Sequence, residues 1–444
     1  MTGGLGVANL PQAGRAALRA GVVGNWVDNI HVFLPLIALG PAMGALAGPG
    51  AGAAAGPLVV VAMLLGRPVG GTVFGQVSDR LGRTRTTRVA IAGTALCALG
   101  IAVMPTHVAL GAATLWLVLA LRFLGGVFVA GEYSAAIPLA MEWSAPRRRG
   151  LMSGLILSMA PLAQGSIAFA TAAMLGWLGQ DAYAQWGWRA LFVVGALCSG
   201  AMLMFYSLQV ADAPTFHRHA GLARARRERG RAVLVGRHSR TFWQVFALMS
   251  GLWLMTAVTV LILPGRLVED ARLAPDDAAI AMGAASLAQA AAMVLAGHLS
   301  TVVGRRALFV GWGLVALLTS PFVWRAVVVA DDLPRAALWA ALLQVVTVSM
   351  YGPVAAYLSE RFPTGVRSTG YGMGYSLSLV LPALYPLYLP ALEGLLGRQG
   401  APTAMLLLGG ALVVGAALVG PRLAPRDFDA EIDEVAREAE EVSA

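Results

Sequence analysis

Three ionisable side chains, Asp28, His31 and Arg122, lie deep inside apolar stretches of this sequence. An ionisable group inside a membrane span is costly to desolvate and therefore marks a functional site by default. Asp28 and His31 are three residues apart, which places them on one face of a helix, where a carboxylate and an imidazole can share a proton. This spacing predicts proton coupling. The alternative is structural: a hydrogen bond between helices for Asp28 and a satisfied buried histidine for His31.

Arg122 offers a planar fork of hydrogen-bond donors and does not deprotonate in proteins. Two roles fit these properties: contact with a substrate carboxylate, or a fixed ion pair with Asp28. Asn25 and Asn29 add polar side chains to the stretch that contains Asp28. We expect both asparagines in the same substrate site as Arg122.

The second half of the chain has few deep charges but many aromatic residues. Tyr371 and Tyr375 are one helical turn apart, in a stretch interrupted by glycine and proline, so this helix is expected to bend at a cavity. We predict that Tyr351, Tyr371 and Tyr375 contact the substrate. Ordinary packing, or a position at the membrane interface, is the alternative for these tyrosines.

The composition assigns these residues to a membrane protein. Of the 444 residues, 58% are hydrophobic and 12% are charged, and the mean hydropathy is +0.71, whereas soluble proteins have roughly 45–50% apolar and about 25% charged residues. The net charge of +9 depends on arginine alone, because the chain has no lysine. The arginines lie in short clusters between apolar stretches, as orienting charges do, so nucleic acid is not expected as a partner.

Twelve apolar stretches, each long enough to span a bilayer, follow one another along the chain. They predict an all-α polytopic membrane protein with two pseudo-symmetric six-helix bundles at 1–211 and 241–422, a basic linker at 212–240 and an acidic tail at 423–444. The predicted spans are 21–43, 57–77, 89–106, 110–141, 151–178, 189–211, 241–264, 277–298, 306–329, 335–358, 369–396 and 402–421.

The distribution of arginines predicts which side of the membrane the loops occupy. The N-terminus, the loops after spans 2, 4, 8 and 10, the linker and the tail hold 24 of the 32 arginines. By the positive-inside rule, both termini and the linker are expected in the cytoplasm. The expected location is the inner membrane of a bacterium.

The two halves carry similar sequence motifs in the loops after equivalent spans, which we call the motif corners. Duplicated bundles are common in secondary transporters, whose substrate site lies near the midplane between the halves. The motif at 75–83 (GQVSDRLGR) after span 2 is echoed at 297–305 (GHLSTVVGR) after span 8, and Glu142 and Arg149 after span 4 are echoed by Glu360 and Arg367 after span 10.

These corners predict a conformational latch. Glycines allow the sharp turn that the motif needs, and Asp79, near a helix end, can pair with arginines of a neighbouring helix. The second copy has Thr301 in place of Asp79, so we expect the charged latch in the first half only. The alternative is that the arginines only set topology. The predicted latch residues are Asp79, Arg80, Arg83, Glu132, Glu142 and Arg149.

Four motifs carry a family resemblance. They resemble the signatures of the major facilitator superfamily, and more closely its metabolite:proton symporter family, over nearly the full chain. The resemblance implies twelve helices, alternating access and proton-driven uptake of small organic acids or zwitterions. The chain departs from the family pattern in the expected pocket, so no member's substrate is carried over. The motifs are GNWVD at 24–28, RPVGGTVFG at 67–75 running into DRLGR at 79–83, RFLGG at 122–126 with Gly131 and Glu132, and ERFP at 360–363 with Arg367 and Gly370, and the departures are Asn29, His31, Gly125 and Phe128.

These observations predict a secondary active transporter that moves a small polar metabolite, an organic acid or a zwitterion, by proton symport. A proton-coupled exporter would use the same parts, and a non-transporting sensor is a further alternative. No enzyme is expected, because the chain has no HExxH, GxSxG or phosphate-binding loop. No cofactor beyond the proton gradient and no metal is expected, since the histidines lack zinc-type spacing. The expected partners are the substrate, protons and membrane lipid, and the expected state is a monomer.

Overall fold

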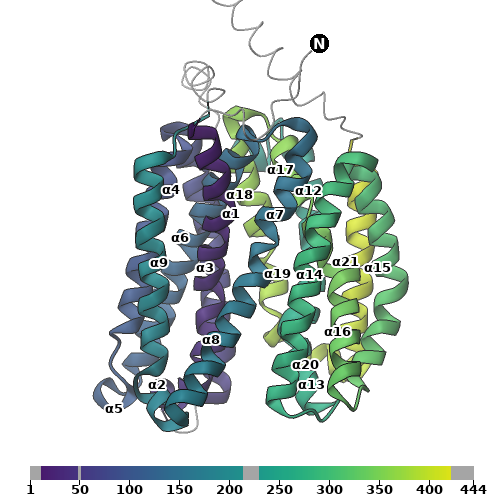
Figure 1. Ribbon diagram of the computed structural model, residues 1–444. Coiled ribbons are helices and arrows are strands. Elements are labelled where there is room, and N and C mark those ends of the chain that lie inside the picture. The colour runs from purple at the N-terminus through teal and green to yellow at the C-terminus, as the bar shows by residue number, and fades with distance from the viewer. Residues whose placement is uncertain (1–11, 49–51, 214–229, 422–444) are drawn as a thin grey trace, which may run out of the picture.

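The fold is described from a computed structural model, which covers residues 12–48, 52–213 and 230–421. Within these ranges the chain is helical and contains no strand. The predicted acidic tail and most of the predicted basic linker lie outside the described residues. Figure 1 shows the helices as two groups side by side, α1–α9 in purple to teal and α12–α21 in green to yellow.

The first half consists of long rods joined by short turns. Two short elements of this half, η2 and η5, are π-helical turns. The rods follow one another in chain order. They are α1 (Gln12–Phe33) with η2 (Leu34–Ala38), α3 (Gly52–Leu81), α4 (Arg83–Ala102), α6 (Ala113–Trp143), α7 (Arg149–Leu157) with α8 (Met159–Ala182), and η5 (Tyr183–Gly187) with α9 (Trp188–Gln209), while η3 (Gly40–Ala42), α2 (Met43–Ala47), α5 (His107–Leu110) and η4 (Pro146–Arg148) lie in the turns.

The second half repeats this order after the short α11 (Gly230–Leu234). The π-helical turn η6 continues α12 just as η2 continues α1. The rods are α12 (Ser239–Thr256) with η6 (Ala257–Ile262) and α13 (Leu263–Glu269), α14 (Pro275–Val303), α15 (Arg305–Val328), α16 (Leu333–Thr347) with η7 (Val348–Tyr351) and α17 (Val354–Arg361), η8 (Thr364–Val366) with α18 (Arg367–Leu377), α19 (Val380–Ala383) and α20 (Tyr385–Leu396), and α21 (Gly400–Val419).

The length and apolarity of these helices agree with a polytopic membrane fold. Eight helices of the described chain are long and apolar enough to cross a membrane, and two further pairs, bent by 43° and 49°, bring the number to ten if each pair is one span. One of the eight runs from 146 to 209 and includes both the α7–α8 rod and α9. α4, whose first turns hold Arg83, Arg85 and Arg88, is not among these helices. The arrangement is consistent with the predicted twelve helices.

The repeated motif turns on glycine in both halves. Gly82, between α3 and α4, has a φ of 101°, and Gly304, between α14 and α15, has a φ of 92°. This left-handed region is open to glycine but strained for other residues. Both corners are therefore sharp turns, as the motif predicts.

The two halves touch closely at one end of the molecule, which we call the arginine-rich end because both motif corners lie there. Here α3 packs against α18, and α7 packs against α14. A Cβ atom on Gly75 would lie 2.8 Å from the Cα of Thr369, and one on Gly297 would lie 2.8 Å from the Cα of Gly154. Only glycine allows such close packing of these helices, so the arginine-rich end is closed.

The opposite end is hollow. A vestibule of about 450 Å³ lies between the start of α3, η3, η6, the start of α14 and the bend before α20. It shares six lining residues with a deeper chamber between the halves: Pro35, Leu36, Val60, Gln164, Val260 and Leu261. The structure is thus closed at the arginine-rich end and open at the other, which we call the open end.

Candidate substrate and proton-coupling site

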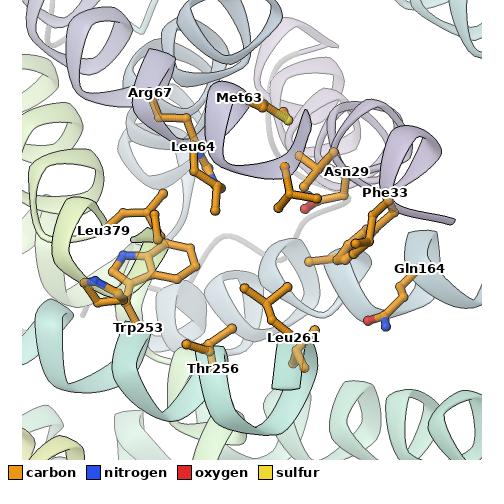
Figure 2. Close-up of a pocket in the computed structure, with 18 of the residues that line it drawn as sticks. Asn29, Phe33, Met63, Leu64, Arg67, Gln164, Trp253, Thr256, Leu261 and Leu379 are labelled. Carbon is orange, nitrogen blue, oxygen red and sulfur yellow. The ribbon is translucent and has the colours of Figure 1, made fainter. Parts of the chain in front are cut away.

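The chamber lies midway along the helices, between the two halves. It has a volume of about 130 Å³, and its walls are mainly apolar. In Figure 2, Asn29, Met63 and Arg67 of the first half face Trp253, Thr256 and Leu261 of the second half across an open space. A mainly apolar cavity with a few converging polar groups is typical of a small-molecule site. The polar and aromatic residues that line it are Asn29, Arg67, Arg122, Tyr133, Gln164, Trp253, Thr256, Gln289, Tyr351 and Tyr375.

Arg67 of α3 is the most enclosed cation of the chamber. Its guanidinium carbon lies 4.9 Å from the ring centre of Tyr133, 5.7 Å from that of Trp253 and 5.6 Å from that of Tyr375. The side chain is buried, and Nε and one terminal nitrogen have no hydrogen-bond partner in the described chain. Three aromatic rings thus hold a cation that keeps free donors. In the sequence, Arg67 lies inside a span but close to the motif corner, which favours a structural role, and only the packing of the helices places it in the chamber.

Arg122 of α6 also lines the chamber. One terminal nitrogen donates to the backbone carbonyl of His31 at 3.1 Å, and the other contacts the sulfur of Met63. Nε has no partner, and no carboxylate of the described residues pairs with this guanidinium. Of the two roles expected for Arg122, the fixed ion pair with Asp28 is not formed in this structure.

The second half supplies the aromatic wall. The rings of Trp253 and Tyr351 are 5.4 Å apart and those of Trp253 and Tyr375 are 5.2 Å apart, each pair edge to face. Thr256 donates to the Tyr351 hydroxyl at 3.3 Å. Tyr371 stacks on Tyr375 at 5.9 Å, but it is fully buried and does not line the chamber. The structure therefore brings two of the three predicted tyrosines to the chamber.

The two asparagines of α1 occupy different environments. Asn29 lines the chamber, and its amide donates to the Tyr133 hydroxyl at 2.7 Å. Asn25 lies one turn further from the chamber and donates to the carbonyl of Ile156 at 2.6 Å. Asn25 thus ties α1 to α7, outside the predicted substrate site.

Asp28 lies behind the chamber wall, where its carboxyl group hydrogen-bonds to that of Glu132 on α6. Glu132 also accepts from the Thr94 hydroxyl at 2.8 Å. Both acids are buried. The latch prediction placed Glu132 at the arginine-rich end, but α6 continues for ten residues from Glu132 to Glu142, about 15 Å along a helix. Glu132 therefore joins Asp28 and not the motif arginines.

His31 faces away from Asp28. Its Nε2 lies 2.7 Å from the hydroxyl of Ser199 on α9, and the residue is buried. Although the two residues are three positions apart, Asp28 faces α6 and His31 faces α9, so no shared proton joins them in this structure. The contact with Ser199 fits the structural alternative, in which His31 is a buried histidine with its hydrogen bonding satisfied.

Asp79 closes the arginine-rich end by capping a helix of the other half. Its two carboxylate oxygens accept from the backbone N–H groups of Ser368 at 3.0 Å and Thr369 at 2.8 Å, and from the Thr369 hydroxyl at 2.7 Å. These groups form the first turn of α18, where unpaired N–H groups and the helix dipole favour an anion. Arg83 lies 3.8 Å from the same carboxylate.

Two glutamates complete this end in a pseudo-symmetric arrangement. Glu142 accepts from Arg83 of its own half and from Arg367 of the other half, both at 2.8 Å. Its counterpart Glu360 accepts from Arg305 of its own half at 3.1 Å and lies 3.9 Å from Arg149 of the other half. Five of the predicted latch residues thus lie at this end, and one of them, Arg80, is exposed and forms no ion pair within the described chain.

No group of three or more potential metal ligands occurs among the residues that the structure describes. Two matching helical halves around a central chamber, with one end closed and the other open, define a secondary transporter. The chain belongs to the Major Facilitator Superfamily, whose family profile matches residues 29–378. It is accordingly a multi-pass membrane transporter and not an enzyme.

Curated relatives support the same class. The chain is 27% identical over 351 residues to a citrate-proton symporter of Salmonella typhi, covering 76% of this chain and 77% of the relative. It is 28% identical over 326 residues to the alpha-ketoglutarate permease of Escherichia coli K12, covering 72% and 73%. It is 26% identical over 331 residues to a proline/betaine transporter of Escherichia coli K12, covering 72% of this chain and 65% of the relative.

Solved structures share the fold. The proton:xylose symporter XylE, bound to 6-bromo-6-deoxy-D-glucose, superimposes with a TM-score of 0.72 at 16% identity, covering 91% of this chain and 94% of that chain. The human organic anion transporter MFSD10 gives a TM-score of 0.70 at 16% identity, covering 92% and 100%. At this identity the likeness concerns the fold alone.

Proposed function

We propose that this protein is a proton symporter that takes up a small organic anion bearing at least one carboxylate. The observation that carries the proposal is a pair of buried arginines, Arg67 and Arg122, that face the chamber without a carboxylate partner in the described chain. Buried charges are costly unless they are paired. An anionic substrate would supply the missing charge, and the forked guanidinium geometry suits a carboxylate.

Asp28 couples this anion to a proton. Arg67 is the cation of the chamber whose charge acts on Asp28. A substrate carboxylate on Arg67 would offset that cation, and the Asp28–Glu132 pair would then hold a proton more tightly. Linkage requires the converse, that a protonated pair favours substrate binding. Anion and proton thus bind together, as symport requires.

The names of relatives agree with an anionic or zwitterionic substrate. A citrate-proton symporter and an alpha-ketoglutarate permease are among them, as is a proline/betaine transporter. We favour the organic acids because the chamber has two arginines, while its aromatic wall could also receive the quaternary ammonium of a betaine. The His31 contact with Ser199 supports Asp28 and not His31 as the proton carrier.

The closed arginine-rich end faces the cytoplasm in this proposal, with both termini on that side. The positive-inside distribution of arginine supports the orientation. The structure then corresponds to an outward-open state, ready to take substrate and proton from outside the cell. The latch of Asp79 and Glu142 must break for release into the cytoplasm.

Transport in proteoliposomes tests the proposal. The purified protein is reconstituted at an acidic external pH, and uptake of labelled citrate and α-ketoglutarate is measured beside that of proline and glycine betaine. We expect uptake of a carboxylate together with acidification of the lumen, and loss of the acidification in Asp28→Asn. Uptake that ignores the pH gradient would refute symport. Movement of substrate and protons in opposite directions would identify the alternative, a proton-coupled exporter.

The binding role of the two arginines has its own test. Arg67→Gln or Arg122→Gln removes a charge-assisted hydrogen bond of about 1.5–3 kcal/mol, so the Kd for the carboxylate should rise about 10- to 150-fold. Arg189→Gln is the matched control, because Arg189 lies outside the chamber, donates to the carbonyl of Ala102 and stacks on Trp188. An unchanged Kd in both chamber variants would rule out an anion site between them.

A further inference from the structure

Arg67 presents a free edge of its guanidinium in the chamber. The group hydrogen-bonds to the Tyr375 hydroxyl, but Nε and Nη2 are buried and have no partner in the described chain. These two nitrogens are neighbours on one edge of the planar guanidinium, and their parallel N–H groups match the two oxygens of one carboxylate. Because a buried donor without a partner is costly, this edge is suited to hold a single carboxylate.

Arg122 adds positive charge to the same part of the chamber but few donors. Its terminal nitrogens donate to the carbonyl of His31 and contact the sulfur of Met63, so only Nε lacks a partner in the described chain. Met63 is one helical turn before Arg67 on α3. Both cations therefore belong to one wall of the chamber, formed by α3 and α6, which we call the arginine wall.

The rest of the cavity carries no charge. Arg67 and Arg122 are the only charged residues among the described residues that line the chamber, and no charged residue among them lines the vestibule. Away from the arginine wall, Gln164, Thr256 and Gln289 supply neutral polar groups only. A second carboxylate placed there would be withdrawn from water without a cation to pair with, which is unfavourable.

An apolar passage leads from the chamber to the open end. Leu36 of η2, Val60 of α3 and two residues of η6, Val260 and Leu261, line both the chamber and the vestibule, so they surround the junction between the two. Leu261 borders the open space between the halves in Figure 2. Apolar groups of a substrate that lie at this junction are removed from water, which favours binding.

We infer that the substrate is an amphipathic monocarboxylate, whose carboxylate binds the Nε–Nη2 edge of Arg67 and whose apolar body points past Leu36 and Leu261 toward the open end. The inference rests on the proposed uptake of an organic anion and narrows its substrate class. Arg122 adds positive charge beside this carboxylate and does not hold a second one. Anions with two or three carboxylates bind more weakly, although relatives of this chain are named for citrate and alpha-ketoglutarate.

Two anions of similar size test the substrate class. α-Ketoglutarate and α-ketoisocaproate share the same α-keto carboxylate end, but an isopropyl group in the second replaces the carboxymethyl group of the first. Binding to the purified wild-type protein is measured by calorimetry at neutral pH. We expect the Kd of α-ketoisocaproate to be at least tenfold lower, because its binding buries an apolar group and no unpaired charge. An equal Kd, or a lower one for α-ketoglutarate, would overturn the inference.

A cation placed on the apolar side of the chamber should change this preference. In Leu261→Arg, the new guanidinium can pair with the distal carboxylate, so the ratio of the two Kd values should shift at least tenfold toward α-ketoglutarate. Leu261→Met is the matched control, because it keeps the position apolar at similar volume, and its ratio should stay within twofold of wild type. An unshifted ratio in a folded Leu261→Arg protein would show that the substrate body lies elsewhere and would overturn the inference. If this variant does not fold, the wild-type comparison decides alone.

The same measurements separate this inference from the proposed function. If the wild type binds neither of the two anions nor citrate, the anion site itself is refuted. If α-ketoisocaproate binds as expected but its uptake into proteoliposomes ignores the pH gradient, the proposed symport is refuted and the substrate class stands. Tighter binding of α-ketoglutarate with proton-driven uptake would confirm the symport and overturn the substrate class.

Discussion

Replacing Asp79 by alanine should open the arginine-rich end. All three groups that donate to its carboxylate belong to Ser368 and Thr369 of the other half, so the contacts exist only while this end is closed. Loss of a charged helix cap and its hydrogen bonds costs about 2–3 kcal/mol. The ratio of closed to open molecules at this end should therefore fall about 30- to 160-fold.

Distances between spin labels would report this shift. Leu81 at the end of α3 and Val303 at the end of α14 are both exposed and occupy matching positions in the two halves. Labels are placed there in a background that lacks the two free cysteines, Cys97 and Cys198. Asp79→Ala should add a population with a longer distance, and this population should dominate if the wild type already samples the open state at a few per cent.

The pseudo-symmetric position provides the control. Thr301 replaces Asp79 in the second half, and its hydroxyl accepts from Arg305 of the same half at 3.1 Å. Thr301→Ala removes this hydrogen bond within one half and no helix cap between the halves, so it should leave the distance distribution close to that of wild type. If Asp79→Ala also leaves it unchanged, or if both variants shift it equally, the capping of α18 does not hold this end closed.

Two further predictions use the same pair of labels. Glu142→Gln should lengthen the distance between the labels more than Glu360→Gln does. The reason is that Glu142 lies 2.8 Å from Arg367 of the other half, whereas Glu360 lies 3.9 Å from Arg149. Equal shifts would contradict this ranking. Gly75→Ala should also lengthen the distance, because the added Cβ would lie 2.8 Å from the Cα of Thr369. Gly311→Ala is the control and should leave the distance unchanged, because the space around Gly311 is open. If Gly75→Ala stays closed, close packing of α3 on α18 is not what requires glycine at this end.

The helical membrane fold and its internal repeat could be predicted from the sequence because both depend on local patterns. Apolar length defines a span, and the glycines of the two motifs adopt the expected positive φ at Gly82 and Gly304. The depth of an ionisable residue could also be estimated from its distance to the ends of its span. The predicted contrast between a charged first half and an aromatic second half describes the chamber lining well.

The direction of each side chain could not be predicted in the same way. Asp28 and His31 share one side of α1, but a helix inside a bundle contacts several neighbours, and these two residues face α6 and α9. The sequence places Glu132 and Arg67 inside spans, near the motif corners, but only the packing of α6 and α3 places the first beside Asp28 and the second among three aromatic rings. Which helix covers which face is a tertiary property, and no span reveals it alone.

The two π-helical turns that follow α1 and α12 occupy matching positions in the two halves. Leu34 and Ala257, their first residues, are 223 positions apart, nearly the spacing of the repeated motifs. A π-helical turn holds one residue more than an α-helical turn, so each half carries an extra residue at the same place. Both turns line the chamber, through Leu36 in the first half and Leu261 in the second. The sequences LPLIA and AVTVLI differ, so the two halves widen the helix beside the chamber in the same way with different side chains.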